Sequence, residues 1–278
     1  MKIGFIGLGN MATAIIGGLL REDTTLNSED GNATVITAAN IIGSAKTEAT
    51  RQKRAEQFGI AVTASNREVA EAADVLVLAV KPQFFPEVIA EIRDAVSENT
   101  LVISIAAGLT LERIAGLFDR NVTAMRLIRC MPNTPALVNA GCTAVVPGPG
   151  ATEADEALCL RLMESFGRAI VIPERLMDAA SATAGSSPAF VFMFIEALAD
   201  GGVLLGLPRA QAMEMAAQML IGTAKMMLES GKHPGAIKDM VCSPGGTTIE
   251  GVRALEEGAF RASVMNAISA CVEKAKAL

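Results

Sequence analysis

The chain has 278 residues, of which 51% are hydrophobic and 19% charged, with neither Trp nor Tyr and a net charge of −6. A chain of this length buries a large core and most naturally forms two domains. The acidic balance and the lack of basic runs or stacking aromatics argue against a nucleic-acid or anionic-membrane surface. So much apolar surface must be hidden between subunits as well as within one, and we expect a homo-oligomer.

The first residues predict a strand, a turn and a helix. Residues 3–20 carry no charge and superficially resemble a signal peptide or a membrane span, but four glycines within 4–17 and Asn10 interrupt them. The pattern is better interpreted as a buried strand over 2–6 and a helix over 10–20. We therefore expect a cytoplasmic protein with no membrane segment.

A glycine fingerprint lies between this strand and this helix. The hexapeptide at 7–12, GLGNMA, matches the GxGxxG/A pattern. In that pattern Gly7 permits the tight turn, Gly9 lets the backbone approach a pyrophosphate, and Ala12 lets the helix pack closely on the strand. The position of the motif, more than its letters, predicts dinucleotide binding.

The second strand is predicted at 33–38, followed by a helix at 44–57 that Gly59 ends. NAD enzymes usually place a carboxylate after this strand for the ribose 2′-hydroxyl. Here the strand runs into Ala38, Ala39 and Asn40, and basic residues follow at 46, 51, 53 and 54. This favours a 2′-phosphate and hence NADP(H). The alternative is that the basic residues form the solvated face of a helix.

Continuous apolar runs at 74–80 and 101–105 predict strands that are buried on both faces, and runs at 121–130, 142–146 and 168–172 extend the series. Strands that alternate with helices predict an α/β fold with a Rossmann-type, doubly wound, mostly parallel sheet. The segments AVKP (79–82), AAG (106–108) and MPNTP (131–135) then lie at its carboxyl edge. Asn133 in the last of them orients a ligand or fixes a turn.

After Pro173 the pattern becomes helical to the end of the chain. The sequence therefore predicts a dinucleotide-binding domain at 1–173 and an all-helical domain for substrate binding and dimerisation at 174–278. A helix over 189–205 is apolar nearly all round, which is typical of a bundle interior or a subunit interface.

The stretch at 242–250, CSPGGTTIE, combines hydroxyls, glycines and a predicted helix start. Thr247 and Glu250 have the spacing of a capping box, so a helix begins there with unpaired backbone N–H groups at its end. These groups suit a small carboxylate, although an ordinary helix start gives the same letters.

In this order, GLGNMA, AVKP, AAG, MPNTP and SPGGTT make the sequence similar to pyrroline-5-carboxylate reductases over nearly its whole length, with 20–60 the most divergent stretch. The resemblance implies an NADPH site, with NADH as the alternative cofactor, lined by Ile6, Gly7, Leu8, Gly9, Asn10, Met11, Asn40, Asn66, Ala79, Val80, Lys81, Pro82, Ile105, Ala106 and Ala107. It implies a substrate site formed by Ser243, Gly246, Thr247 and Thr248.

The implied reaction is the last step of proline biosynthesis, in which a hydride adds to the imine carbon of 1-pyrroline-5-carboxylate. A protonated imine is already an electrophile, so the site needs proximity and a polar group at the nitrogen. Thr248 is the catalytic candidate, and no metal is expected, because the five cysteines are scattered. Members of the family are homodimers that often assemble into homodecamers.

Three other titratable residues are candidates for acid–base catalysis, but a structural role explains each of them more simply. His233, the single histidine, precedes Pro234 at a predicted helix start, and Glu196 and Asp200 form the polar stripe of an apolar helix. One rival function is a 3-hydroxyacid reductase, but those enzymes place a catalytic lysine in the first long helix of the second domain, and none lies between Lys81 and Lys225. The other rival is a non-catalytic, NADPH-binding regulatory protein.

Overall fold

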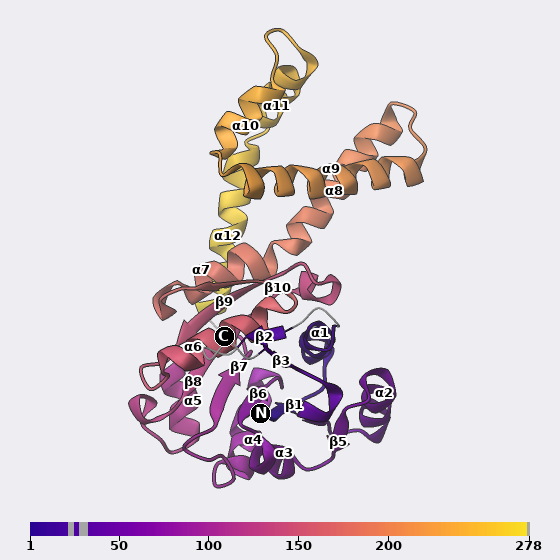
Figure 1. Ribbon diagram of the computed structural model, residues 1–278. Helices are drawn as coiled ribbons and strands as arrows, with labels where there is room; N and C mark the ends of the chain where they lie inside the picture. The colour runs from indigo at the N-terminus through magenta and orange to yellow at the C-terminus, as the bar shows by residue number, and fades with distance from the viewer. Residues whose placement is uncertain (22–24, 28–32, 277–278) are drawn as a thin grey trace. The chain divides into compact units, whose positions relative to one another are not determined.

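The computed structural model describes residues 1–21, 25–27 and 33–276, which divide into two compact units (Figure 1). Unit 1 comprises residues 1–185 and the end of the last helix from residue 274, and unit 2 comprises 186–273. The predicted boundary at 173 follows the last strand of unit 1, whereas the compact unit continues to Gly185. The polar stretch at 21–32 lies mainly outside the described residues.

Unit 1 is built around an eight-stranded sheet in the order β10-β9-β8-β7-β6-β1-β4-β5. All neighbouring strands are parallel except β8 and β9, so the predicted Rossmann-type, mostly parallel sheet is confirmed. Its strands are β1 (Ile3–Ile6), β4 (Ile41–Ser44), β5 (Ala61–Thr63), β6 (Val75–Leu78), β7 (Leu101–Ser104), β8 (Leu127–Met131), β9 (Gly141–Pro147) and β10 (Gly167–Val171).

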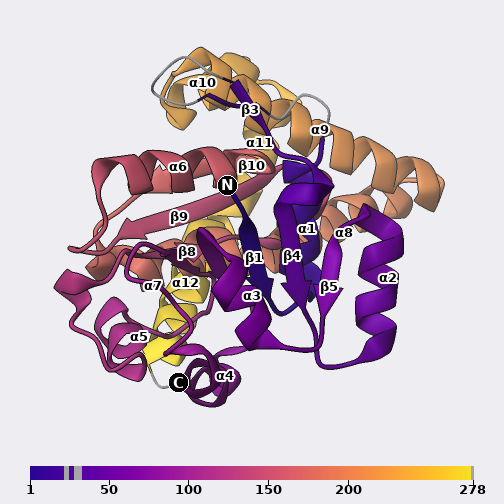
Figure 2. The ribbon, with the colours of Figure 1, turned by 60° about the horizontal axis from the view of Figure 1, so that its bottom comes forward.

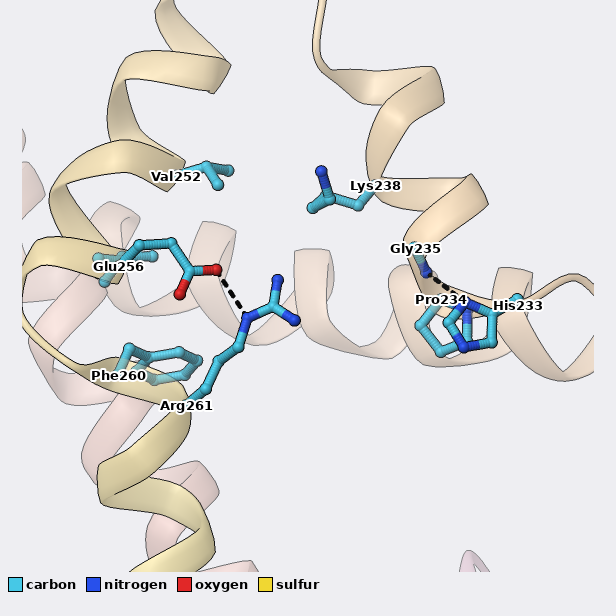
Figure 3. A pocket seen from close by; sticks show the side chains of 9 residues that line it. His233, Pro234, Gly235, Lys238, Val252, Glu256, Phe260 and Arg261 are labelled. Carbon is cyan, nitrogen blue, oxygen red and sulfur yellow. Dashed lines mark hydrogen bonds and ion pairs between the residues drawn. The ribbon is translucent and has the colours of Figure 1, made fainter.

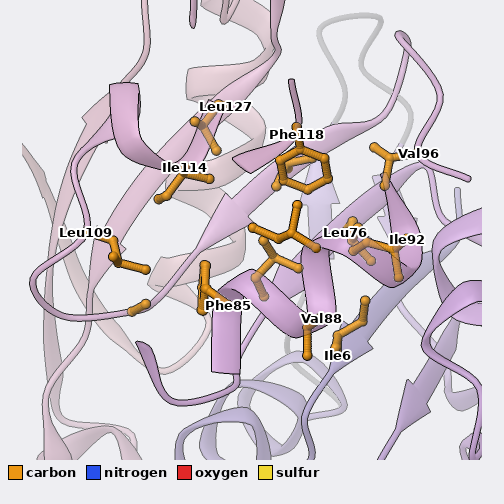
Figure 4. Close-up of a cluster of buried hydrophobic side chains, with 14 of the residues drawn as sticks. Ile6, Leu76, Phe85, Val88, Ile92, Val96, Leu109, Ile114, Phe118 and Leu127 are labelled. Atoms are coloured by element: carbon orange, nitrogen blue, oxygen red, sulfur yellow. The ribbon is translucent and has the colours of Figure 1, made fainter. Parts of the chain in front are cut away.

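Helices cover both faces of this sheet (Figure 2). One buried cluster joins the sheet to α1 (Asn10–Leu19) and α6 (Glu153–Glu164). The opposite cluster, in which Ile6, Leu76 and Phe85 meet (Figure 4), joins it to α3 (Asn66–Ala72), α4 (Phe85–Ile92) and α5 (Leu111–Leu117). Strands covered on both faces bury consecutive side chains, which explains their unbroken apolar runs.

The segment predicted as the second strand contains a strand, but its predicted place in the main sheet is wrong. Residues 33–35 form β3 (Ala33–Val35), which pairs with β2 (Thr25–Asn27) in a separate antiparallel ribbon, and the sheet position beside β1 belongs to β4. β4 needs Gly43, because a Cβ at that position would lie 2.6 Å from Cδ2 of Leu8. The β-branched run at 33–38 resembles a strand more than the glycine-interrupted β4 does, so pattern alone favoured the wrong segment.

Unit 2 is entirely helical, as predicted. Its helices are α8 (Pro188–Leu204), α9 (Arg209–Ser230), α10 (Pro234–Val241), α11 (Thr247–Glu257) and α12 (Phe260–Lys276). The last residues of α12 belong to unit 1, which also contains α2 (Glu48–Phe58) and the short α7 (Met177–Ala180). α8 and α9 pack together, and the rings of Phe194 and Phe260 lie 5.8 Å apart.

The apolar face of α8 is not covered within a single chain. Only Ala199 of this helix is buried, whereas Phe192 and Met193 are 68% and 69% exposed. The helical stretch Glu174–Leu204 is, by length and composition, long and apolar enough to cross a membrane. An exposed apolar helix of this kind equally suits an interface between subunits, as the sequence indicated.

An ion pair between a half-buried Arg126 and a buried Asp155 joins the residue before β8 to the start of α6. The side chain of Asp155 is 1% exposed and accepts a hydrogen bond from Nε of Arg126 at 3.0 Å. It also accepts one from the backbone N–H of Thr152 at 2.9 Å, closing a capping box. Burial raises the pKa of Asp155, but the hydrogen bonds from Arg126 and Thr152 together outweigh it and hold the pKa below its ordinary value.

The ion pair predicts a pH-dependent stability. Replacing Asp155 with Asn leaves the guanidinium of Arg126 without its charge partner, and the free energy of unfolding should fall by about 3 kcal/mol at pH 7. A lowered pKa stabilises the fold above the ordinary Asp value of about 3.9 and loses this effect as the pH falls through the folded-state pKa. The difference between wild type and D155N in urea unfolding should therefore shrink in acid.

The matched control is Asp119→Asn. Asp119 pairs with Arg93 on the surface, where both side chains are largely exposed, so this change should cost less than about 1 kcal/mol. An equal loss in both variants would contradict the special role of the Arg126–Asp155 pair.

Candidate functional site

The carboxyl ends of β1, β6, β7 and β8 enclose a cavity of about 420 Å³, which we call the cofactor edge. Its lining includes most of the residues predicted for the cofactor, and the loop after β8 joins them. The lining residues are Gly9, Asn10, Met11, Ala79, Val80, Lys81, Pro82, Ile105, Ala106, Ala107, Met131, Pro132, Thr134 and Leu137. The structure thus brings together four loops that are far apart in the sequence.

The glycine loop after β1 has the shape that a pyrophosphate requires. Gly7 has a φ of +94°, and a Cβ on it would lie 2.9 Å from Cγ1 of Val80, so only glycine fits. A Cβ on Gly9, in contrast, would meet no protein atom within 4 Å. Gly9 is the N-cap of α1 and no side chain caps this helix. An open backbone and uncapped N–H groups fit a bound dinucleotide phosphate.

Ile6 and Leu8 are not among the residues that line the cavity, and their side chains are buried in the two core clusters. Asn66 lies at the start of α3, beside the end of β4. Its Oδ1 accepts a hydrogen bond from Oγ of Ser44 at 2.7 Å, and its Nδ2 donates one to Glu91 at 2.7 Å. Asn66 is therefore held by two partners at the carboxyl end of the sheet.

Asn40 lies at the opposite end of the sheet, so its predicted place in the cofactor site is wrong. It precedes β4, whose first residue, Ile41, pairs with Ile3 at the start of β1. Its side chain closes a capping box with Thr37 and donates to the backbone O of Met1. Because β4 ends at Ser44, the carboxyl end of this strand presents Ser44 and the residues that follow it.

The basic residues after β4 differ in their availability. Nη1 of Arg51 donates to the backbone O of Ala45 at 2.7 Å, and Nε of Arg54 donates to the backbone O of Leu8 at 3.3 Å. Lys46 is exposed immediately after the strand. Lys46 is among the basic residues noted in the sequence, but Ser44 was missed, because the second strand of the sheet was predicted before Asn40.

In unit 2 the predicted substrate residues share one turn, residues 243–248, which we call the substrate turn. Gly245 has a φ of +67°, and the N–H of Gly246 donates to the backbone O of Ser243 at 3.0 Å. Oγ of Ser243 lies so close that a Cβ on Gly246 would be 2.3 Å from it. The turn therefore depends on both glycines and holds the Ser243 hydroxyl over the start of α11.

The capping box predicted for Thr247 and Glu250 is wrong. The N-cap of α11 is Gly246, no side chain caps the helix, and Glu250 instead accepts from Nε of Arg253 at 2.9 Å. Thr247 and Thr248 are the first two residues of the helix. Their backbone N–H groups lack a capping side chain, which makes this helix end a better seat for a carboxylate than a capped one.

His233 has a structural role, as expected. It is the N-cap of α10, and its Nδ1 accepts a hydrogen bond from the backbone N–H of Gly235 at 3.1 Å (Figure 3). Glu196 and Asp200 are exposed, and Asp200 pairs with Arg209. Among the described residues, no group of three or more His, Cys, Asp or Glu side chains could hold a metal ion.

Comparisons with known proteins match both units. Residues 2–108 match the family model for NADP oxidoreductase, coenzyme F420-dependent, and residues 174–278 match that for pyrroline-5-carboxylate reductase dimerisation. A pyrroline-5-carboxylate reductase of Escherichia coli (strain K12) is 49% identical over 277 residues, which span 100% of this chain and 98% of the relative. The chain belongs to the pyrroline-5-carboxylate reductase family.

Solved structures of pyrroline-5-carboxylate reductases share the fold over the whole chain. One from Coxiella burnetii has a TM-score of 0.88 at 34% identity, covering 99% of this chain and 97% of the other. One from Plasmodium falciparum, with NADP bound, has a TM-score of 0.81 at 30% identity, covering 100% and 97%. The dimerisation match also supports the homo-oligomer expected from the apolar surface of α8.

A methyl group added at Gly9 should weaken NADPH binding, whereas one added at Gly7 should destabilise the fold. In Gly9→Ala the methyl meets no protein atom, so the melting temperature should stay unchanged, but it occupies the space that the pyrophosphate needs. The NADPH dissociation constant should rise by about tenfold or more, equivalent to about 1.4 kcal/mol. It can be measured from the fluorescence of NADPH, because the chain has no Trp or Tyr.

Gly7→Ala is the comparison. Its positive φ and its contact with Val80 should lower the free energy of unfolding by about 1–3 kcal/mol. Normal NADPH affinity in Gly9→Ala would place the pyrophosphate elsewhere.

Proposed function

We propose that this chain reduces 1-pyrroline-5-carboxylate to L-proline with NADPH, the last step of proline biosynthesis. One observation carries the proposal: the two family matches coincide with the two sites. The oxidoreductase match at 2–108 contains the three loops from Gly9, Ala79 and Ile105, and the dimerisation match at 174–278 contains the substrate turn. Each candidate site thus lies within one of the two family matches.

Unit 1 would hold the cofactor mainly through its backbone. The open face of Gly9 and the uncapped start of α1 would receive the pyrophosphate, and Asn66, fixed by Ser44 and Glu91, would meet the adenosine ribose. Lys46, exposed just beyond β4, would attract the 2′-phosphate. When bound, NADPH supplies the hydride that reduces the C=N bond.

Unit 2 would hold the substrate by its carboxylate. The hydroxyl of Ser243 and the backbone N–H group of Thr247 lie at the uncapped start of α11, where the helix dipole favours a negative charge. Gly246, whose own N–H donates to the backbone O of Ser243, would leave space for the carboxylate beside them. The Thr248 hydroxyl, one residue further along the helix, would face the ring nitrogen and orient it or pass it a proton. No strong acid is needed, since the imine is reduced in its protonated form.

The oligomer is proposed to be a dimer built by unit 2, with a decamer as the larger form, and the protein is proposed to be cytoplasmic, with neither nucleic acid nor membrane as a partner. The apolar side chains that α8 leaves exposed supply the interface. The acidic charge of the chain supports the exclusion of polyanionic partners.

The rival functions lack support. A 3-hydroxyacid reductase would need its lysine on α8, which contains none. A regulatory protein without activity would not need the substrate turn. The direct test is NADPH oxidation on addition of 1-pyrroline-5-carboxylate, followed by absorbance, with L-proline identified by chiral chromatography. A folded protein that binds NADPH without turnover would overturn the proposal.

Cofactor preference should depend on the end of β4. In Lys46→Glu the new carboxylate repels the 2′-phosphate, so the ratio of kcat/KM for NADPH to that for NADH should fall by about tenfold, or about 1.4 kcal/mol. Asn40→Asp is the matched control, because it adds the same charge at the opposite end of the strand. Its preference should equal that of the wild type, and a reversed pattern would restore Asn40 to the site.

The role of Thr248 can be divided between its hydroxyl and its bulk. Thr248→Ser keeps the hydroxyl, whereas Thr248→Ala removes it. The alanine variant should lose about 30-fold in kcat/KM for the imine, roughly 2 kcal/mol, as expected for a hydrogen bond to a charged group. The serine variant should stay close to the wild type, and NADPH affinity should be normal in both. Equal kinetics in the two variants would remove the hydroxyl from the mechanism.

A further inference from the structure

Asn133 lies in the loop after β8. Both polar atoms of its side chain form hydrogen bonds to other segments of the chain. The residue is 8% exposed. Its Oδ1 accepts from the backbone N–H of Cys142 at 2.8 Å, and its Nδ2 donates to the backbone O of Ala184 at 3.0 Å. Both polar atoms of the amide are thus used within unit 1.

The two partners belong to functionally different segments. Cys142 is the second residue of the strand β9, while Ala184 lies in a π-helix, Ser181–Ser186. π-Helical turns are rare and often occur at functional sites. This one ends where the chain passes from unit 1 into unit 2, at Gly185 and Ser186. Asn133 therefore fixes the last turn before the helical unit.

The other side of the same loop forms the cofactor edge. Met131, Pro132 and Thr134, the neighbours of Asn133, line the cavity. Cε of Met131 also approaches the π-helix, since a Cβ on Gly185 would lie 3.7 Å from it. The loop thus contacts the cofactor cavity on one side and the start of the chain segment leading to the substrate turn on the other.

We propose that Asn133 is a positioning residue for hydride transfer: its amide fixes the π-helix at 181–186 to the loop that lines the cofactor cavity. The inference rests on the proposed reduction of the imine. Asn133 is itself not among the residues that line the cofactor cavity. Its effect is exerted through the loop after β8, which lines the cofactor cavity and which the amide holds against β9 and the π-helix.

Only an amide satisfies both partners. A carboxylate keeps the acceptor for Cys142 N–H but presents a second oxygen to the carbonyl of Ala184, which repels it. Asn133→Asp should therefore release the π-helix while preserving the bond to β9. Asn133→Ser, whose hydroxyl both donates and accepts, is a milder second variant that keeps the test available if the aspartate variant does not fold.

The first measurement needs no cofactor. In hydrogen–deuterium exchange of the free protein, amides of residues 181–190 should exchange faster in N133D than in the wild type. The control is Asn121→Asp, which keeps its capping bond to Thr123 N–H and lies in another loop. Unchanged exchange in N133D would overturn the proposal, because the amide would then not hold the π-helix.

The second measurement is kinetic. N133D should lose about 30-fold to 100-fold in kcat with the imine, the scale of a small misplacement of reacting groups, while NADPH affinity changes less than about threefold. Its primary deuterium isotope effect with deuterated NADPH should rise, because hydride transfer becomes slower than product release. N133S should fall between N133D and the wild type.

The outcomes separate the two proposals. A wild type that does not oxidise NADPH with the imine overturns the proposed function. An active wild type whose N133D variant shows fast exchange but normal kcat overturns the positioning role alone and reduces Asn133 to a stabilising residue. Loss of stability by itself does not raise the isotope effect of the molecules that remain folded.

Discussion

The close approach between the loop after β1 and the end of β6 is the contact on which the rest of the cofactor edge depends. Gly7 leaves β1 with a positive φ and passes so near Ala79 and Val80 that no side chain fits between them. This contact sets where α1 begins, and therefore where its uncapped N–H groups point. The sheet core supports it, since all four residues of β1 are buried.

The two proposed ligand sites share one structural feature. α1 and α11 both begin after a glycine N-cap in extended conformation, and neither has a side-chain cap. Each helix end therefore presents free backbone N–H groups and the positive end of its dipole. A protein with a net charge of −6 can thereby hold two anionic molecules with few cationic side chains. The positive charge is local to the helix ends.

Much of this arrangement could be predicted from the sequence, because buried strands and glycine turns have strong local signals. The strands β1, β6 and β7 follow from unbroken apolar runs, and the cofactor loops follow from their carboxyl ends. β4 could not be predicted, since its Gly43 is explained only by Leu8, which packs against it in the folded chain. The misplacement of Asn40 followed from that one error. The bonds of Asn133 to Cys142 and Ala184 were likewise hidden, because they join segments far apart in the sequence.

The apolar side chains of unit 2 have a consequence for how the protein reaches its native state. Phe192, Met193 and Leu204 are exposed in a single chain, so part of the hydrophobic stabilisation of this unit becomes available only when subunits meet. Folding and assembly are then linked by mass action, and thermal unfolding becomes concentration-dependent. At low concentration a single chain leaves this apolar surface exposed to solvent. The concentration of partner chains then determines how long the surface stays exposed.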